Sequence, residues 1–295
     1  GGITRLIHVN RPWAPQSWFD LIITPPQYAL PARPNVMTNV MPFVGQPTGT
    51  TPTASFLRRA AELPRPWTVV LVGGKSRPFV LDDAAARRLA NVVNAQVRNV
   101  GGSAWVLDSP RTPDAAMSTL EQALDVPSLV VRWRDGDNLY GTLLGHGDRF
   151  IVTSDSASML SEAVLTGKPV QLFDLPVQSD LRWRIASAWA AAGARAPASM
   201  AARTYEAMRD LGLLSSVRDL ARLHCALRDA NLLGGNASPL EQVERDQRWA
   251  RPGLPQGRRR VSLPVSSRGM ASPVDAVVSV RSDVSARDFV AQQRR

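Results

Sequence analysis

Three serines and one aspartate crowd residues 154–158, directly after an apolar, β-branched run at 150–153 that is typical of a strand covered on both faces. These four residues are Ser154, Asp155, Ser156 and Ser158. We expect a helix to begin here, and the unpaired amides and dipole of a helix start favour an anion such as phosphate. The alternative is ordinary helix capping, for which a single Ser or Asp suffices.

Glu162 adds a carboxylate to the same predicted helix. It lies four residues after Ser158, so the two side chains share one helix face. A carboxylate one turn from an anion-binding helix start can accept hydrogen bonds from sugar hydroxyls, and the alternative is a solvated glutamate. Gly167 is expected to end the helix in the left-handed conformation, and Lys168 leads into the next strand. A βαβ unit with a polar lip of this kind has the geometry of a ligand site.

A Gly-Gly turn with a cation follows another predicted strand. It reads Gly73-Gly74-Lys75-Ser76. It is not a P-loop, because Val69 stands where that motif requires its first glycine. It is not a dinucleotide fingerprint either, because Lys75 and Pro78 occupy the second and third glycine positions. The turn either brings backbone and a cation to the carboxyl edge of the sheet or is a tight turn without a ligand.

A third polar loop, at 109–112, contains Arg111, whose forked guanidinium suits phosphate oxygens. Thr112 precedes Pro113 and is predicted to cap the helix that begins there. Ligands of open α/β sheets bind at the carboxyl ends of the strands. We therefore expect the three polar loops to converge at one edge of a parallel sheet.

The composition is that of a globular protein, and 295 residues allow more than one domain. No run approaches the 18 apolar residues of a membrane span. The single cysteine, Cys225, excludes an internal disulfide, and the three histidines are scattered. We expect no structural zinc, no other metal and no cofactor. A reducing cytoplasmic setting, peripheral to a membrane or away from one, fits this cysteine content.

The net charge of +10 comes almost entirely from arginine, since Lys75 and Lys168 are the only lysines. Each lysine directly follows a glycine at a predicted edge of the sheet. Much of the positive excess lies in the C-terminal tail, which includes three arginines at 258–260. A basic tail attracts nucleic acid or anionic lipid non-specifically. Because no aromatic residues interleave with these charges, we expect no specific nucleic-acid site.

Alternation of strands and helices predicts an α/β fold with a parallel sheet covered on both faces. Strands are expected at 3–9, 19–24, 35–38, 68–72, 104–108, 129–132, 150–153, 170–173 and 274–280. Helices are expected at 55–63, 82–97, 113–123, 138–144, 157–166, 181–192, 202–211 and 216–230. The helix at 181–192 is amphipathic, with two tryptophans.

The chain opens within a strand-like segment, so we expect residues 1–54 to be the remnant of a truncated N-terminal Rossmann-like domain. This remnant ends in a linker rich in Pro, Gly and Thr. Residues 55–200 are predicted to form the ligand-binding domain, and 201–233 a set of C-terminal helices. The composition of 234–295 is typical of a largely disordered basic tail.

One block of the chain is distinctive. It reads Asn138-Leu-Tyr140-Gly, then Asp148-Arg-Phe-Ile-Val-Thr-Ser-Asp155-Ser156-Ala-Ser158-Met159-x-Ser161-Glu162-Ala, then Thr-Gly167-Lys168-Pro169-Val. Supporting pieces are Val72-Gly73-Gly74, Ser109-x-Arg111-Thr112-Pro113, Phe19-Asp20-Leu-Ile-Ile and Pro34-Asn35-Val36. From residue 1 to about 230, the chain resembles the mitochondrial fission ELM1-like family. The block is also similar to the donor-binding half of GT-B glycosyltransferases, in which two Rossmann-like domains clasp a nucleotide-sugar.

The resemblance implies a GT-B-like fold with a nucleotide-sugar as its ligand. It implies that Glu162 binds ribose hydroxyls and that Ser156, Ser158 and the helix start hold the diphosphate. The implied donor-binding residues are Gly73, Gly74, Lys75, Ser76, Arg111, Thr112, Ser154, Asp155, Ser156, Ser158, Met159, Glu162 and Lys168. Dipoles and cations would then neutralise the leaving diphosphate in place of a metal.

The chain departs from the family at Pro26-Gln27-Tyr28, where acidic and histidine residues are usual. The sequence identifies no catalytic residue. Two interpretations stay open. One is a metal-independent glycosyltransferase, active or inactive in this truncated form. The other is a non-catalytic adaptor that acts through protein or membrane-surface contacts, with the apolar face of the helix at 181–192 as its surface. The donor sugar, base, acceptor, stereochemistry and oligomeric state do not follow from the sequence.

Overall fold

The computed structural model contains two compact units, which are described separately below. The residues that it describes are 4–12, 14–45, 52–135, 139–178, 181, 184–185, 188–189, 199–210, 218–234 and 277–281. The first unit comprises Gly1–Pro42, Trp183–Ala226 and Glu241–Arg295, and the second comprises Phe43–Arg182 and Leu227–Leu240.

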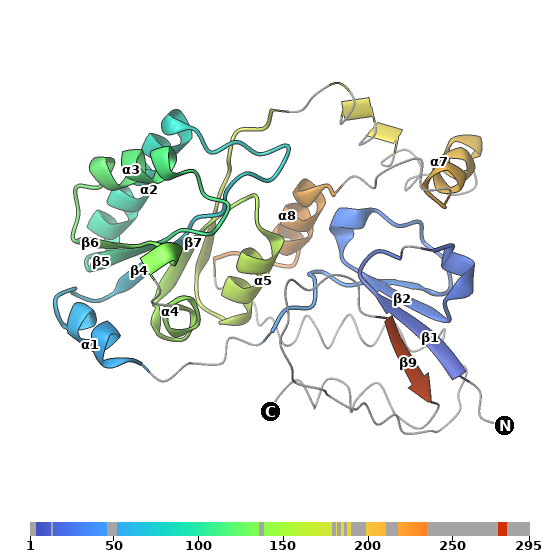
Figure 1. The fold of residues 1–295 in the computed structure, drawn as a ribbon, viewed down its shortest axis with the longest axis horizontal. Helices are drawn as coiled ribbons and strands as arrows, with labels where there is room; N and C mark the ends of the chain where they lie inside the picture. The colour runs from blue at the N-terminus through green and yellow to red at the C-terminus, as the bar shows by residue number, and fades with distance from the viewer. Residues whose placement is uncertain are drawn as a thin grey trace. The chain divides into compact units, whose positions relative to one another are not determined.

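The second unit is built on a five-stranded parallel sheet (Figure 1). Its strands, in spatial order, are β6 (Ser128–Val131), β5 (Ser103–Leu107), β4 (Trp67–Leu71), β7 (Arg149–Thr153) and β8 (Val170–Phe173). All neighbours are parallel. The predicted parallel α/β sheet is therefore confirmed, with strand ends that differ from the expected ones by one residue at most.

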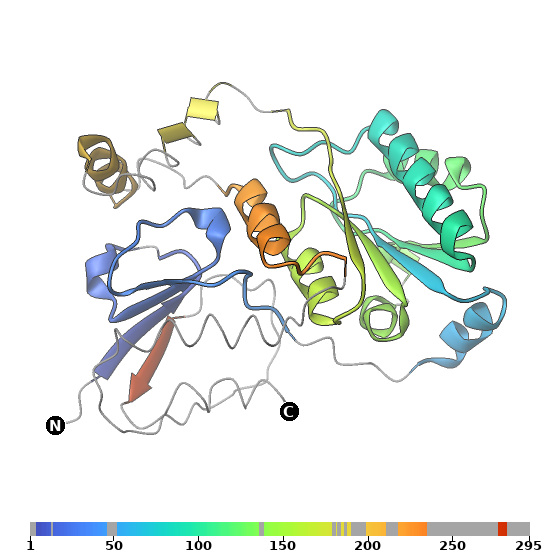
Figure 2. The ribbon, with the colours of Figure 1, turned by 180° about the vertical axis from the view of Figure 1, so that it is seen from behind.

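Helices cover both faces of this sheet (Figures 1 and 2). On one face lie α2 (Asp83–Val100) and α3 (Asp114–Ala123), and on the other lie α4 (Tyr140–His146) and α5 (Ala157–Leu165). This division follows from right-handed crossovers, because the chain adds strands first on one side of β4 and then on the other. A short 3-10 helix, η3, spans Trp133–Asp135.

The apolar core lies between the sheet and its helices. Val70, Val106 and Ile151 are neighbours across β4, β5 and β7, and they join one buried cluster with Leu89 and Val93 of α2. Because helices cover both faces, every residue of β4 and β5 is buried. Burial on both faces is the physical reason that these strands appear in the sequence as continuous apolar runs.

An additional helix, α1 (Ala54–Ala61), belongs to the same unit through one aromatic side chain. Phe56 is 1% exposed, and its ring centroid lies 5.4 Å from that of Trp105 and 5.8 Å from that of Trp67. The hydroxyl of Thr53 accepts a hydrogen bond from the Phe56 amide at 3.2 Å and caps the helix. The predicted helix at 55–63 is therefore present.

The first unit contains a four-stranded sheet in the order β3-β2-β1-β9. Its strands are β1 (Thr4–Val9), β2 (Leu21–Thr24), β3 (Val36–Thr38) and β9 (Val277–Arg281). The first three run parallel, and β9 pairs with β1 in the antiparallel direction, as both views show (Figures 1 and 2). Two 3-10 turns, η1 (Gln16–Trp18) and η2 (Pro26–Tyr28), flank β2.

Further along the chain, α7 covers Met200–Asp210 and α8 covers Leu220–Asp229, near the two helices expected there. The predicted helix at 181–192 lies largely outside the described residues, although those that are described within it are helical. The expected strand at 274–280 corresponds to β9. The other residues of the predicted tail beyond 234 lie outside the described part of the chain, so the disorder expected for them stays a prediction.

One predicted detail is wrong. Thr112 does not cap α3, because the N-cap residue is Pro113 and no side chain caps this helix. The Thr112 hydroxyl instead donates to the Val72 carbonyl oxygen at 3.1 Å and accepts from the Ser109 amide at 2.9 Å. A buried hydroxyl already engaged by two neighbouring loops is not available to the helix behind it.

Candidate functional site

The three polar loops meet at the carboxyl edge of the five-stranded sheet, as the sequence predicted. The Lys75 amide donates to the Arg111 carbonyl oxygen at 3.0 Å. The Gly74 amide donates to Oδ2 of Asp155 at 2.7 Å. These two bonds join the loops after β4, β5 and β7, which come from three adjacent strands. We refer to residues 73–76, 109–112 and 154–158 as the edge loops.

The start of α5 offers unpaired backbone donors at this edge. Ser156 is the N-cap, and its hydroxyl accepts from the Met159 amide at 3.4 Å. The amides of Ala157 and Ser158 have no acceptor among the described residues, as expected in the first turn of a helix. Ser158 is exposed and Met159 is half-buried. The helix start therefore combines two free amides with one exposed hydroxyl, an arrangement that suits an anion.

Asp155 lies beneath this helix start and is fully buried, with 0% exposure. Its Oδ2 accepts from Gly74 and its Oδ1 accepts from the Thr153 hydroxyl at 2.7 Å. Burial raises the pKa of the Asp155 carboxyl above its usual range, while the Gly74 and Thr153 donors and the charge of Arg111 act against that rise. The carboxylate therefore serves the protein's own loops.

The backbone amides of the Gly-Gly turn are not available to a ligand, which differs from one of the two interpretations of this turn. Its three amides are all bonded within the protein, because Gly73 donates to the Thr153 hydroxyl at 2.8 Å, Gly74 to Asp155 and Lys75 to Arg111. Gly73 and Gly74 are also buried. The turn therefore does not offer its amides to a ligand. It contributes the exposed Lys75 side chain and the half-buried Ser76.

Two other predicted residues, Ser154 and Thr112, use their hydroxyls for contacts within the protein. The buried Ser154 hydroxyl accepts from the Leu175 amide at 3.0 Å, and the Ser154 amide donates to the Phe173 carbonyl at 3.0 Å. The Thr112 hydroxyl also donates to the Gly73 carbonyl. Arg111, in contrast, is exposed. Of the predicted set, Lys75, Arg111 and Ser158 are exposed, while Ser154, Asp155, Ser156 and Thr112 are buried.

Glu162 is half-buried on α5, and the hydroxyl of Tyr140 on α4 donates to its Oε2. Burial raises the pKa of Glu162, and the hydrogen bond from Tyr140 works against that rise. The pKa of Tyr140 is raised as well, because the ring is desolvated and the Glu162 charge disfavours a phenolate. Tyr140 is therefore a neutral donor that orients the Glu162 carboxylate.

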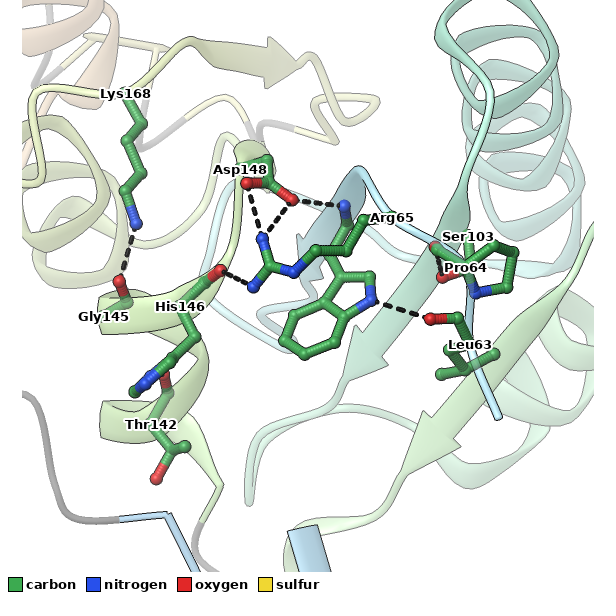
Figure 3. Close-up of polar contacts among 10 residues, drawn as sticks. Leu63, Pro64, Arg65, Ser103, Thr142, Gly145, His146, Asp148 and Lys168 are labelled. Carbon is green, nitrogen blue, oxygen red and sulfur yellow. Dashed lines mark hydrogen bonds and ion pairs between the residues drawn. The ribbon is translucent and has the colours of Figure 1, made fainter. Parts of the chain in front are cut away.

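Lys168 does not lie with the other predicted residues. It precedes β8, so it lies at the amino edge of the parallel sheet, opposite the edge loops. Its ammonium group donates to the Gly145 carbonyl at 2.7 Å, at the end of α4 (Figure 3). Burial lowers the pKa of Lys168. The structure therefore corrects the inclusion of Lys168 in the candidate site.

The amino edge around Lys168 is held by a compact polar cluster. Nη1 of Arg65 contacts both carboxylate oxygens of Asp148, at 2.7 and 2.8 Å (Figure 3). Asp148 also accepts from the Trp67 amide at 2.7 Å, and Arg65 lies 3.9 Å above the Trp67 ring. These contacts link the start of β4 to the start of β7.

Three residues near the edge loops escaped the sequence-based prediction. Thr153 and Tyr140 belong to the distinctive block, but the sequence predicts only a strand for Thr153 and only a helix for Tyr140. Trp133, at the end of β6, is 47% exposed, and its amide donates to Oδ1 of Asp108 at 2.6 Å. The signal in the sequence is a tryptophan directly after a predicted strand.

Among the described residues, no group of three or more His, Cys, Asp or Glu side chains could hold a metal ion. Within the same part of the chain, no helix is both long and apolar enough to cross a membrane.

A family model described as mitochondrial fission ELM1 matches residues 1–214. An uncharacterized protein of Rickettsia prowazekii, RP120, is 27% identical over 142 residues, which are 45% of this chain and 40% of that protein. The mitochondrial fission protein ELM1 of Arabidopsis thaliana is 34% identical over 129 residues, which are 43% and 29% of the two chains. The match thus spans less than half the length of these relatives.

The fold is similar, at low TM-scores, to those of solved glycosyltransferases. The glycosyltransferase VinC in complex with dTDP has a TM-score of 0.30 and 17% identity, covering 77% of this chain and 52% of its own. The spinosyn forosaminyltransferase SpnP has a TM-score of 0.33 and 18% identity, covering 79% and 55%. Phytolacca americana UGT2, complexed with UDP-2-fluoroglucose and pterostilbene, has a TM-score of 0.31 and 11% identity, covering 79% and 48%.

Proposed function

The chain belongs to the mitochondrial fission ELM1 family, and we propose that its edge loops bind the diphosphate of a nucleotide-sugar. The observation that carries the proposal is the grouping of donors and cations at one edge of the sheet. The Ala157 and Ser158 amides have no acceptor among the described residues, and the loops bonded to the same turn carry the exposed Lys75 and Arg111. N–H donors and cations in combination suit the oxygens of two phosphates.

Glu162 supplies the second half of the proposal. It lies one helical turn beyond Ser158, and Tyr140 occupies only one of its oxygens. The other oxygen is the acceptor that we assign to a ribose hydroxyl. The proposed ligand therefore lies along α5, with its diphosphate at the helix start and its ribose one turn further on.

In the glycosyl transfer that this ligand permits, an acceptor oxygen forms a bond to the anomeric carbon and the bond from that carbon to the diphosphate breaks. The nucleoside diphosphate leaves with the electron pair of that bond, and the proton of the acceptor hydroxyl is released to solvent. Lys75, Arg111 and the start of α5 stabilise the negative charge that develops on it. The proposal assigns no general base and no acceptor.

The proposal is tested by ligand binding. UDP, dTDP and GDP, and the glucose or mannose conjugate of each, are added to the protein while its melting temperature and calorimetric heats are recorded. We expect at least one of them to raise the melting temperature, and Glu162→Ala to abolish that shift. Failure of the whole panel to stabilise the protein at millimolar concentration would remove the nucleotide-sugar proposal.

A second candidate function is that of a non-catalytic adaptor, a role consistent with the similarity to the plant mitochondrial fission protein ELM1. The observation that favours it is the exposure of Leu181 and Ile185, at 68% and 56%. Large apolar side chains at such exposure mark protein or membrane contacts when they cluster. Under this function Glu162→Ala is silent, while Leu181→Ser with Ile185→Ser abolishes partner capture. Capture that is insensitive to both substitutions removes the support for the adaptor.

A further inference from the structure

We propose that Asp155 is a positioning residue whose buried carboxylate fixes the Gly73–Lys75 turn against the start of α5 and so sets the spacing between Lys75 and the α5 amides. The inference rests on the proposed function for its ligand, but its structural part stands on contacts alone. Asp155 does not touch the ligand in this proposal. It acts through the two loops that it joins.

The contacts of Asp155 bridge two strands. One carboxylate oxygen accepts from the Gly74 amide at 2.7 Å, and the other accepts from the Thr153 hydroxyl at 2.7 Å. Thr153 in turn accepts from the Gly73 amide at 2.8 Å. The carboxylate and the hydroxyl thus hold two successive amides of the turn. No described residue other than these two accepts from the Gly73 and Gly74 amides.

Close packing also fixes the Gly73–Lys75 turn against Asp155. A Cβ atom added to Gly73 would overlap the Asp155 carboxylate, and one added to Gly74 would overlap the Arg111 carbonyl. The turn is therefore packed against the carboxylate on one side and against the loop after β5 on the other. Because Asp155 is 0% exposed, it cannot move outward to relieve such an overlap. The two glycines, the Asp155 carboxylate and the Arg111 carbonyl are therefore in close packing contact.

Lys75 directly follows these two packed glycines. Its amide donates to the Arg111 carbonyl, so the backbone under the Lys75 side chain is fixed by the same set of bonds. Ser156 and the free amide of Ala157 follow Asp155 by one and two residues. A change in the Asp155 contacts would therefore shift the cation and the helix start relative to each other. A diphosphate that spans both would lose affinity, because the alignment of its contacts depends on this spacing.

Two substitutions separate shape from charge. In Asp155→Asn, the amide oxygen accepts from Gly74, and the amide nitrogen donates to Thr153. The Thr153 hydroxyl then donates to the Leu71 carbonyl, which lies 3.5 Å away. In Asp155→Ala both contacts are lost. A matched control is Asn94→Ala on α2, which also removes two hydrogen bonds from a buried side chain, those with Ala123 and Asp125.

The first measurement is amide hydrogen exchange in the ligand-free protein. We expect Asp155→Ala to speed exchange at Gly73 and Gly74 by about tenfold or more relative to Asn94→Ala, while Asp155→Asn retains near-wild-type protection. The amide of Val70 in the buried strand β4 reports the change in overall stability of each variant, and the rates at Gly73 and Gly74 are compared after that change is subtracted. Equal exchange at the two glycines in the Asp155→Ala and Asn94→Ala variants would overturn the proposal.

The second measurement is the Kd for UDP, or for whichever nucleoside diphosphate binds the wild type most tightly. We expect Asp155→Ala to raise Kd about tenfold and Asp155→Asn and Asn94→Ala to leave it no more than about threefold above the wild-type value. A Kd for Asp155→Asn as poor as that for Asp155→Ala would overturn the positioning role. If the wild type binds no nucleotide, the proposed function fails, and the exchange measurement still decides whether Asp155 fixes the turn.

Discussion

Tyr140 on α4 donates a hydrogen bond to the carboxylate of Glu162 on α5, so two helices that cover the same face of the sheet are joined at the rim of the candidate site. This bond orients Glu162 and holds the pKa of its half-buried carboxyl lower than burial alone would set it. The tyrosine is part of a helix that contributes no other residue to the candidate site. It therefore links the packing of α4 to the chemistry proposed for α5.

Tyr140→Phe removes this donor without changing the shape of the ring. We expect the variant to fold, since the phenol is lost but the packing is retained, and to bind nucleoside diphosphate about threefold to tenfold more weakly. Calorimetric titration of Tyr140→Phe, Glu162→Ala and the double variant checks this. The losses should be less than additive, because Tyr140 acts through Glu162. Fully additive losses would show that Tyr140 acts on the ligand independently.

Acid titration should reveal the cost of burying Asp155. Its pKa in the folded protein lies above its ordinary value, so the folded state holds the proton more tightly than the unfolded chain does. The contribution of this group to stability is therefore present at low pH and is lost as the pH rises through the folded-state pKa. Asp155→Asn does not titrate, so its free energy of unfolding should improve relative to wild type as the pH rises above about 4, the ordinary Asp value, by about 1.4 kcal/mol for each unit of pKa shift.

Urea unfolding at several pH values measures this difference. Both proteins should show the same denaturant dependence, so that the comparison reports stability rather than a change in the unfolded state. A difference between Asp155→Asn and wild type that stays constant across the range would contradict the raised pKa.

The two lysines provide a matched pair for mapping the site. Lys75 is exposed on an edge loop, whereas Lys168 donates to Gly145 at the opposite edge of the sheet. We expect Lys75→Met to weaken binding of nucleoside diphosphate about tenfold, the effect of one lost charge-assisted contact. Lys168→Met should leave the Kd unchanged and lower the melting temperature slightly. Equal losses of affinity in both variants would contradict the placement of Lys75, and not Lys168, at the nucleotide site.

Much of the second unit could be predicted from its sequence, because the sequences of buried parallel strands are continuous apolar runs. The meeting of the edge loops also followed from order alone, since each loop comes directly after a strand. The same order could have excluded Lys168, which comes directly before a strand and so lies at the amino edge. A glycine-lysine pair before a strand and one after a strand lie at opposite edges of a parallel sheet.

The internal use of the Gly-Gly turn could not be predicted in this way. It depends on the register of β4 against β7, which places Thr153 and Asp155 beside two successive amides. A sequence indicates that Asp155 follows a strand but not which backbone groups it meets. The pairing of β9 with β1 likewise cannot be predicted from local sequence, because more than 260 residues separate the two strands.

The attachment of α1 provides a prediction that is independent of any ligand. Phe56 is 1% exposed and packs its ring within 6.0 Å of the rings of Trp67, Trp105 and His146. Phe56→Ala should lower the free energy of unfolding by about 3–5 kcal/mol, the usual cost of removing a buried phenyl ring. The neighbouring Leu57 is 56% exposed, so Leu57→Ala should cost less than about 0.5 kcal/mol. Chemical denaturation of both variants measures the contrast, and equal costs would show that α1 does not dock through Phe56.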